Sequence, residues 1–462
     1  MTTICPPLEL LARIIEKTKY QPERDYRLCR QCVVQPLPAG MLLFHTLTLE
    51  LLLLDAEEAN RLADLPGKVP ECLTSLIRKR FLVPTDENEN AYCEQLRHIV
   101  ALTNRKSDAI TSYTILPTSD CNARCFYCYE LGRSRIPMSM ETARLAAAYI
   151  AAHCKGEKVA LHWFGGEPLF NLPAIDAIIN GLNDQGVSYS SGMISNGYLF
   201  DEALVKKAKE EWRLRRIQIT LDGTEPVYNQ RKAYIYREGS AYRRVLRNIR
   251  LLLDAEIRVS IRLNLDMNNK ADLIALVDEL AERFAGKKGL SIYDHIIFER
   301  PENPRSAEER AELYRASAEL TAHIRKRKMG ADYGVPRLFR TNWCMADRAA
   351  ATTILPDGRL GKCEHYSESE TWGALWSDEK DEKMLSDWQR RMPPLPACAD
   401  CFYYPACIRL DKCPNHFGYC DPEYRSQRKD ELQRQMLISF ERWNAKQDNN
   451  EPMDMRKGTG AI

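Results

Sequence analysis

The sequence of 462 residues contains no long uninterrupted apolar run. A membrane-spanning helix needs roughly 18 or more consecutive apolar residues, whereas the apolar runs here, such as Leu51 to Leu54, have the length of core segments. The N-terminal residues, MTTICPPLELLARIIEK, also lack the basic-then-apolar order and the small-residue cleavage site of a signal peptide. We therefore expect a cytoplasmic protein that makes no membrane contact.

An excess of charge of one sign is missing too. The chain has 66 Lys and Arg against 64 Asp and Glu, a net charge of +2, so nothing indicates a surface for nucleic acid or for anionic membranes. Internal repeats and low-complexity tracts are absent, and the composition argues against coiled-coil and disordered classes. With about three times the length of a typical domain, the chain is predicted to form two or three domains.

Cysteine is absent between residues 155 and 343, yet the whole chain has 16. Thiols stay unpaired in a reducing compartment unless something binds them, so this number indicates metal or redox chemistry rather than disulfides. Cys121, Cys125 and Cys128 form a tight trio, and seven more cysteines lie between Cys344 and Cys420.

The cysteine-free middle alternates between strand and helix patterns. Short β-branched or apolar runs predict strands at 112–116, 159–164, 188–194, 216–221, 258–265 and 291–298. Amphipathic patterns predict helices at 140–153, 172–182, 202–210, 242–255 and 271–284. Such alternation requires a parallel sheet. We expect an α/β fold, a partial TIM-like (β/α)6 barrel over residues 106–305, with its reactive end at the C-terminal edge of the strands.

The flanking segments have other patterns. Residues 1–105 resemble a small winged α+β module with, in order, an amphipathic helix, strands at 26–36 and 41–48, helices at 57–65 and 71–80, and a last strand at 81–83. Residues 306–462 begin with a helix after Ser306, where Glu309 suits a capping box. They continue with the cysteine-rich region and end in a charged helix from Pro422 to about Lys446.

The trio stands in SDCNARCFYCYE, directly after the first predicted strand of the barrel. Three thiolates cannot supply the four closed ligands of a structural zinc site, although zinc remains the alternative. An iron-sulfur cluster can use three thiolates and leave its fourth iron open to a substrate or cofactor. The CxxxCxxC spacing therefore favours a cluster.

Further polar motifs follow the other predicted strands. WFGGEP, with Gly165, Gly166 and Glu167, follows the second strand, and its glycines can bring backbone close to a ligand. A Ser195-Asn196-Gly197 turn follows the third strand and Leu221-Asp222-Gly223 follows the fourth, while Arg262 and Asn264 share one face of the fifth. Together these motifs predict a binding site at one edge of the sheet.

With these motifs the sequence closely resembles the radical S-adenosylmethionine (radical SAM) superfamily. The resemblance implies a 4Fe-4S cluster on Cys121, Cys125 and Cys128, with the amino and carboxylate groups of S-adenosylmethionine (SAM) on its open iron. It also implies a reductive cleavage of SAM to a 5'-deoxyadenosyl radical that abstracts hydrogen. It further assigns cofactor-binding roles: Tyr127 to the adenine through backbone, Gly165, Gly166 and Glu167 to the amino group, Ser195 and Asn196 to the ribose or methionine, and Arg262 to the cofactor.

The seven C-terminal cysteines look like the SPASM extension of radical SAM peptide modifiers, with paired zinc ribbons as the alternative. By that resemblance Cys344, Cys363 and Cys413 bind a first auxiliary 4Fe-4S cluster. A second auxiliary cluster is implied on Cys398, Cys401, Cys407 and Cys420. Seven ligands are one short of the eight that fill two clusters. The first cluster could therefore bind a substrate thiolate, or take a fourth ligand from Asp347, Glu364, His365 or a distant residue.

Asp222 is the candidate catalytic base, because a carboxylate at a strand end can take the proton lost after hydrogen abstraction; a simple Asp-Gly turn is the alternative. Six cysteines have no predicted role: Cys5, Cys29, Cys32, Cys72, Cys93 and Cys154.

Residues 1–105 look like the leader-recognition domains of enzymes that mature ribosomally synthesised peptides, in which an edge strand can pair with the leader. We therefore expect a radical SAM/SPASM peptide maturase that forms a thioether or other crosslink in a precursor peptide. Its one-electron donor would be a flavodoxin or a ferredoxin. The alternatives are a sulfatase-maturase-type formylglycine-forming enzyme, a peptide epimerase, and a non-catalytic iron-sulfur scaffold or electron carrier.

Overall fold

The computed structural model describes residues 1–6, 19–104, 107–299, 303–330, 344–365, 370–407, 410–413 and 420–448. The amphipathic helix expected near the N-terminus falls within 7–18 and lies outside the described residues. Among the helices that are described, none has the length and apolar composition that a membrane span requires.

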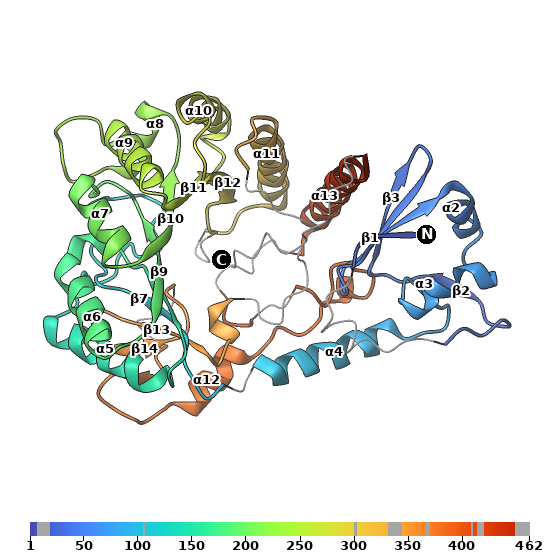
Figure 1. Cartoon of the computed structure of the whole chain (residues 1–462), viewed down its shortest axis with the longest axis horizontal. Helices are drawn as coiled ribbons and strands as arrows, with labels where there is room; N and C mark the ends of the chain where they lie inside the picture. Colours follow the sequence, from blue (N-terminus) through green and yellow to red (C-terminus); the bar gives the residue numbers. More distant parts are fainter. Residues whose placement is uncertain are drawn as a thin grey trace.

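The central domain is an open α/β barrel, as predicted (Figure 1). Its six parallel strands are β7 (Ser112–Ile115), β8 (Val159–Trp163), β9 (Tyr189–Ser195), β10 (Leu214–Leu221), β11 (Arg258–Leu265) and β12 (Leu290–Ile296). The helices are α5 (Met140–His153), α6 (Leu172–Asp184), α7 (Glu202–Glu210), α8 (Glu225–Lys232), α9 (Ala241–Asp254) and α10 (Lys270–Arg283). The short helix α8 was not expected, because its sequence is polar and lacks an apolar period.

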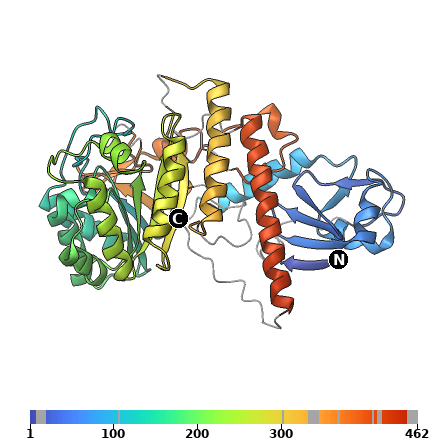
Figure 2. The same cartoon turned by 90° about the horizontal axis from the view of Figure 1, so that it is seen from above.

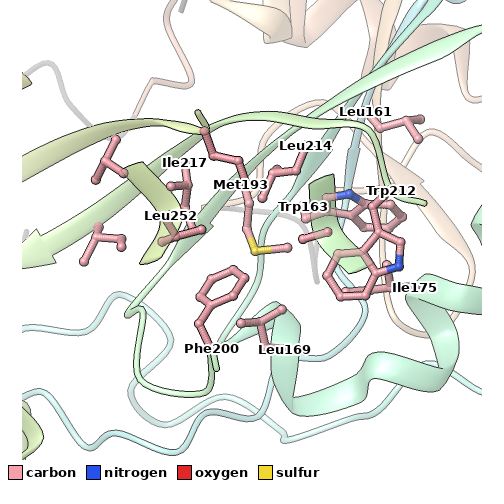
Figure 3. Close-up of a cluster of buried hydrophobic side chains, with 14 of the residues drawn as sticks. Leu161, Trp163, Leu169, Ile175, Met193, Phe200, Trp212, Leu214, Ile217 and Leu252 are labelled. Carbon is pink, nitrogen blue, oxygen red and sulfur yellow. The ribbon is translucent and has the colours of Figure 1, made fainter. Parts of the chain in front are cut away.

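Strand alternation gives this sheet one apolar and one polar face. In β10, Ile217, Ile219 and Leu221 are buried under the helices, while Gln218 and Thr220 lie on the opposite, inner face. The helix-facing core includes large aromatic side chains such as Trp163 and Trp212 (Figure 3). The apolar face therefore supplies the core, and the inner face is free to carry polar chemistry.

The sheet continues beyond β7 with strands from the cysteine-rich region, which were not expected. Strand β13 (Ala351–Ile354) pairs parallel to β7, and β14 (Arg359–Gly361) and β15 (Gly373–Ala374) add antiparallel. These strands are too short to give a periodic signal. Their pairing fixes the C-terminal cysteines beside the strand that precedes the cysteine trio.

The N-terminal module is an α+β unit. One sheet has the order β1 (Thr2–Cys5), β5 (Leu51–Asp55), β4 (Gly40–His45), β3 (Cys32–Leu37), and a separate ribbon pairs β2 (Tyr26–Leu28) with β6 (Leu82–Pro84). Its helices are α2 (Ala56–Leu62), a turn η1 (Glu71–Leu73) leading into α3 (Thr74–Arg78), and α4 (Glu89–Asn104). Strands β1 and β5 and helix α4 were not expected.

Two C-terminal helices join this module to the barrel (Figure 2). Helix α11 (Ala307–Lys326) follows β12 and begins with the predicted Ser306 and Glu309 capping box. Helix α13 (Pro422–Asp448) packs against β3 and completes an apolar core that includes Val33, Phe44 and Met436. The side chain of Gln433 donates to the carbonyl oxygen of Val34 at 2.7 Å.

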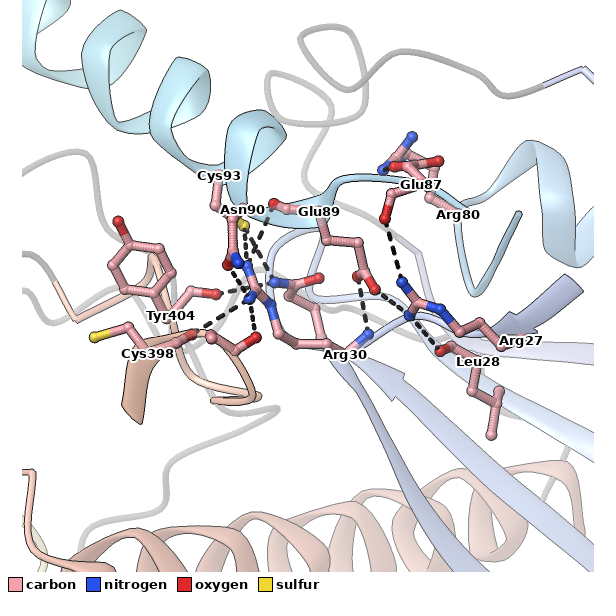
Figure 4. A network of polar contacts seen from close by, with 12 residues as sticks. Arg27, Leu28, Arg30, Arg80, Glu87, Glu89, Asn90, Cys93, Cys398 and Tyr404 are labelled. Atoms are coloured by element: carbon pink, nitrogen blue, oxygen red, sulfur yellow. Dashed lines mark hydrogen bonds and ion pairs between the residues drawn. The ribbon is translucent and has the colours of Figure 1, made fainter. Parts of the chain in front are cut away.

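The module also binds the loop that carries Cys398. Arg30 donates to the carbonyl oxygens of Cys398, at 3.3 Å, and of Ala399, and Gln31 donates to the carbonyl oxygen of Tyr404 at 3.0 Å (Figure 4). The N-terminal module is therefore in direct contact with the C-terminal cysteine region.

His45 gives this module a predictable pH response. The side chain is buried, and its Nδ1 accepts from the backbone N–H of Leu47 at 3.2 Å. Burial, reinforced by Arg80, lowers its pKa to about 3. Because the unfolded chain binds this proton at higher pH than the folded chain, stability is full above pH 6.5 and falls as the pH drops below it.

We expect acidification from pH 7 to pH 5.5 to reduce the free energy of unfolding by about 1.2 kcal/mol through His45. Urea unfolding of the full chain at both pH values, with His45→Asn as the comparison, measures this contribution. The variant should lose less stability than the wild type over this interval. An identical loss in both proteins would contradict the assignment.

Candidate functional site

The cysteine trio lies on the loop that follows β7. The thiols lie together, since Cys125 and Cys128 are among the groups that raise the pKa of Cys121, after burial and Glu167. Burial is the main cause and raises that pKa to about 12. The segment after α8 supports this loop, because Arg124 N–H donates to the Lys232 carbonyl and Ile235 N–H to the Asn122 carbonyl, both at 2.9 Å.

The two glycines of WFGGEP allow the turn after β8 to touch the chain that enters the trio. Gly165 has a φ of 109°, and a Cβ there would overlap the carbonyl oxygen of Thr118. A Cβ on Gly166 would overlap the carbonyl oxygen of Asp120. The two glycines were expected to let the backbone come close to a ligand. In the structure they also let the GGEP turn come close to the loop of the cysteine trio, because a residue with a Cβ would not fit there.

Glu167 joins three of the predicted motifs. It is fully buried, and one carboxylate oxygen accepts from Ser195 Oγ at 2.8 Å while the other accepts from Asn196 N–H at 2.8 Å. Burial raises its pKa to about 7. The Asn196 side chain in turn lies 3.8 Å from Cys121 Sγ and donates to Asn122 Oδ1 at 2.6 Å. Glu167 therefore ties the ends of β8 and β9 to the cysteine loop.

A second polar network lies at the ends of β10 and β11. Asp222 is fully buried, accepts from the Tyr127 hydroxyl and from Asn264 Nδ2 at 2.9 Å, and lies 3.2 Å from Lys232 Nζ. Lys232 also donates to the Tyr127 hydroxyl and to Thr220 Oγ1, both at 2.7 Å. The side chain of Tyr127, expected to contribute only backbone, is thereby held by a buried ion pair.

The charges of this network follow from burial. Burial raises the pKa of Tyr127 well above its usual value, and Asp222 adds to the effect. For Lys232 burial alone would lower the pKa, but Asp222 and Cys125 outweigh it and the pKa is raised. Sequence reasoning missed Lys232, because a lysine at the end of a polar helix has no motif around it.

Arg262 lies on the inner face of β11, beside a group of rings. Its Nη2 lies 3.0 Å from His295 Nδ1, and its guanidinium sits 5.7 Å from the centre of the Phe298 ring. The His365 ring packs 5.0 Å from Phe298 and 4.3 Å from Tyr129. These rings connect the barrel to the segment that carries Cys363.

The structure brings Cys344, Cys363 and Cys413 together. The thiols of Cys344 and Cys413 both contribute to raising the pKa of Cys363, after burial and Glu364. Three residues were named as candidates for the fourth ligand. Glu364 is close enough to raise the pKa of Cys363, and Asp347 accepts a hydrogen bond from Cys344 N–H at 3.4 Å. The ring of the third candidate, His365, lies among the aromatic rings of the barrel instead.

The other four C-terminal cysteines line one cavity. Cys398, Cys401, Cys407 and Cys420 share it with apolar and basic side chains that include Arg428. In the described part of the chain, no three Cys, His, Asp or Glu side chains converge as they would around a single metal ion. A 4Fe-4S cluster binds its thiolates on separate irons, so its ligands stand farther apart than those of one zinc ion.

The cysteines without a predicted role are mostly buried. Burial raises the pKa of Cys29 well above its usual value and that of Cys32 as well. Cys93 accepts from Arg30 at 3.0 Å, and Cys154 lies at the end of α5 with its thiol 3.4 Å from the carbonyl oxygen of Ala151. Cys72 is exposed beside Arg61.

An open α/β barrel with a CxxxCxxC loop after its first strand and a GGEP turn after its second has the architecture of a radical SAM protein. Residues 115–280 match the model of the radical SAM superfamily. The chain therefore contains a radical SAM domain, as its motifs predict.

Curated relatives match about a quarter of this chain. An uncharacterised protein of Methanocaldococcus jannaschii is 29% identical over 123 residues, which are 26% of this chain and 41% of that protein. A probable GTP 3',8-cyclase of Archaeoglobus fulgidus is 32% identical over 115 residues, 24% of this chain and 36% of that enzyme. The chain thus spans about two fifths of the length of these relatives.

Solved structures match more of the chain. The structure of anSMEcpe with bound AdoMet has a TM-score of 0.53 and 14% identity, and the match covers 73% of this chain and 99% of that one. SuiB of Streptococcus suis, bound to S-adenosylmethionine, has a TM-score of 0.51 and 14% identity, with 85% and 98% covered. At this identity the likeness is one of fold, and it includes segments outside the barrel.

Proposed function

We propose that this chain is a radical SAM/SPASM enzyme that oxidatively modifies a ribosomally synthesised precursor peptide by forming a thioether or other crosslink. The observation that carries the proposal is the junction of the cysteine trio with the GGEP turn and with Ser195 and Asn196. These contacts put three thiols beside the polar residues Glu167, Ser195 and Asn196 at the C-terminal edge of the strands.

The donor set fits the proposed cofactors. Three clustered thiols on one loop suit a 4Fe-4S cluster with one open iron, and the backbone of Gly165 and Gly166 with Asn196 would hold the SAM methionine group. When bound, this pair supplies a one-electron cleavage of SAM that yields a radical able to abstract hydrogen from carbon. The two C-terminal sets, of three and four cysteines, would hold the auxiliary clusters.

The chain's own residues position the reaction and handle the proton. Asp222 has no exposed surface, so we assign it to act through Tyr127. The Tyr127 oxygen accepts from Lys232 and from Asn264 while it donates to Asp222, so a substrate proton would take the place of the Asn264 hydrogen bond as the phenol proton passes to Asp222. Lys232 holds both oxygens in place.

The segments outside the barrel support the proposal of a peptide substrate. A structure of SuiB bound to the precursor peptide SuiA has a TM-score of 0.50 and covers 85% of this chain. The N-terminal module contacts the loop of Cys398, so a leader held on the module would lie near the second auxiliary set. A formylglycine-forming activity is the second candidate, because the anSMEcpe fold also appears with a bound Kp18Cys peptide.

The test uses anaerobically reconstituted protein, dithionite or a flavodoxin as reductant, SAM, and a short peptide encoded beside the gene. We expect 5'-deoxyadenosine to form and the peptide to lose a pair of hydrogens. At a cysteine, exchange of sulfur for oxygen together with loss of two hydrogens would indicate formylglycine. A peptide whose mass is unchanged in ordinary water, but which takes up deuterium from heavy water, would indicate epimerisation. Absence of SAM cleavage would overturn the proposal in favour of a non-catalytic scaffold.

A further inference from the structure

Arg262 carries a positive charge that the residues described around it do not pair with an anion. Among the described residues, no carboxylate lies within ion-pair distance of its guanidinium, and its Nε is buried with no hydrogen-bond partner. Asp222, the acidic group whose charge reaches it, already pairs with Lys232 and accepts from Tyr127 and Asn264. The side chain is only partly buried on the inner face of the sheet, so a ligand there can reach it.

The groups around Arg262 do not satisfy its charge. Its strand neighbours in register are Thr220 and Tyr293, its hydrogen-bond partner is His295, and Phe298 covers one side. Removing a guanidinium from water is costly unless an anion compensates. The planar fork of arginine matches a carboxylate, which it can bind through two parallel hydrogen bonds. The residues around Arg262 are therefore suited to bind a carboxylate group that a ligand supplies.

We propose that Arg262 and His295 bind a carboxylate of the peptide substrate, either an Asp or Glu side chain or the C-terminus. This inference rests on the proposed function and names the substrate group. The resemblance puts the SAM carboxylate on the open iron, away from Arg262. The cysteine loop, and Glu167 with its partners Ser195 and Asn196, lie at the ends of β7, β8 and β9. Asn264 on β11 contacts the Tyr127 hydroxyl of the cysteine loop at 3.2 Å, and Arg262 lies two residues earlier on the same face of β11, deeper in the barrel than that contact.

The first experiment needs no substrate peptide. Thermal unfolding of the wild type is measured in sodium propionate, with propionamide and with sodium chloride of equal ionic strength as references. We expect propionate alone to raise the Tm, because it binds only the folded protein, and we expect Arg262→Gln to abolish that rise. Arg262→Lys should retain part of it. Arg216→Gln, which removes another arginine from the inner face, should retain all of it. An equal response of wild type and Arg262→Gln would overturn the site.

The second experiment separates the two carboxylate sources. Binding of SAM and of the precursor peptide is measured for wild type and Arg262→Gln, together with peptides whose acidic residues are replaced by amides and one with an amidated C-terminus. We expect the variant to bind the peptide about 30-fold more weakly, and one amide peptide to bind the wild type as weakly. A matching loss of SAM affinity, or equal binding of all peptides, would overturn the proposal. Absence of SAM cleavage in the wild type would instead refute the proposed function and leave the propionate result standing.

Discussion

Replacing Cys121, Cys125 and Cys128 together by alanine should remove about one third of the bound iron and abolish SAM cleavage. The three 4Fe-4S clusters that we propose would hold about twelve irons per chain, and the three thiols of the loop form a set of their own. Replacing either C-terminal set should also remove about four irons. Iron analysis, Mössbauer spectroscopy and 5'-deoxyadenosine formation measure the result.

The same series counts the auxiliary clusters. The sets to replace are Cys344, Cys363 and Cys413 in one variant, and Cys398, Cys401, Cys407 and Cys420 in the other. Cys72→Ala, an exposed thiol outside every set, is the matched control and should keep all of its iron. A variant that loses one zinc ion in place of about four irons would refute the cluster assignment for that set.

Lys232→Met should destabilise the protein by about 3–5 kcal/mol, the usual effect of leaving one partner of a buried ion pair alone. The Lys232 and Asp222 side chains are 3% and 0% exposed, and Lys232 also donates to Tyr127 and Thr220. The double variant Lys232→Met with Asp222→Asn removes both charges and should recover much of the loss. Urea unfolding of the full chain measures each free energy.

The Lys207 and Asp176 ion pair provides the matched control. Lys207 Nζ and Asp176 Oδ2 lie 2.6 Å apart, but the two side chains are 34% and 30% exposed. Lys207→Met should therefore reduce the free energy of unfolding by less than about 1 kcal/mol. Equal reductions of the free energy of unfolding for Lys232→Met and Lys207→Met would contradict the prediction that the buried Lys232 and Asp222 pair depends more on its partner than an exposed pair does.

The periodic part of the fold could be predicted from local sequence. The apolar alternation of Arg258–Leu265 and the amphipathic helix Met140–His153 appear in the structure with the predicted bounds, because both elements bury the face that their own period defines. Parallel pairing then follows from the alternation of strands with helices. It brings the motifs that follow β7, β8 and β9 to one edge, where Glu167 connects them.

The aperiodic part could not be predicted in this way. Strands of two to four residues, such as β13, take their place from pairing with a partner far along the chain. The same holds for α13, whose apolar residues complete the core of a module about 400 positions earlier. Local patterns carry no record of which distant surface a segment will cover.

The sequence by itself determined an α/β barrel with a cysteine trio and polar turns at the ends of its strands. Only the tertiary structure decided that Lys232 pairs with Asp222 and Tyr127, that Arg262 has no carboxylate partner in the described part of the chain, and that the N-terminal module binds the loop of Cys398. The physical reason is that spacing along the chain fixes which face a residue takes, whereas pairing of charges depends on which segments meet when the chain is folded.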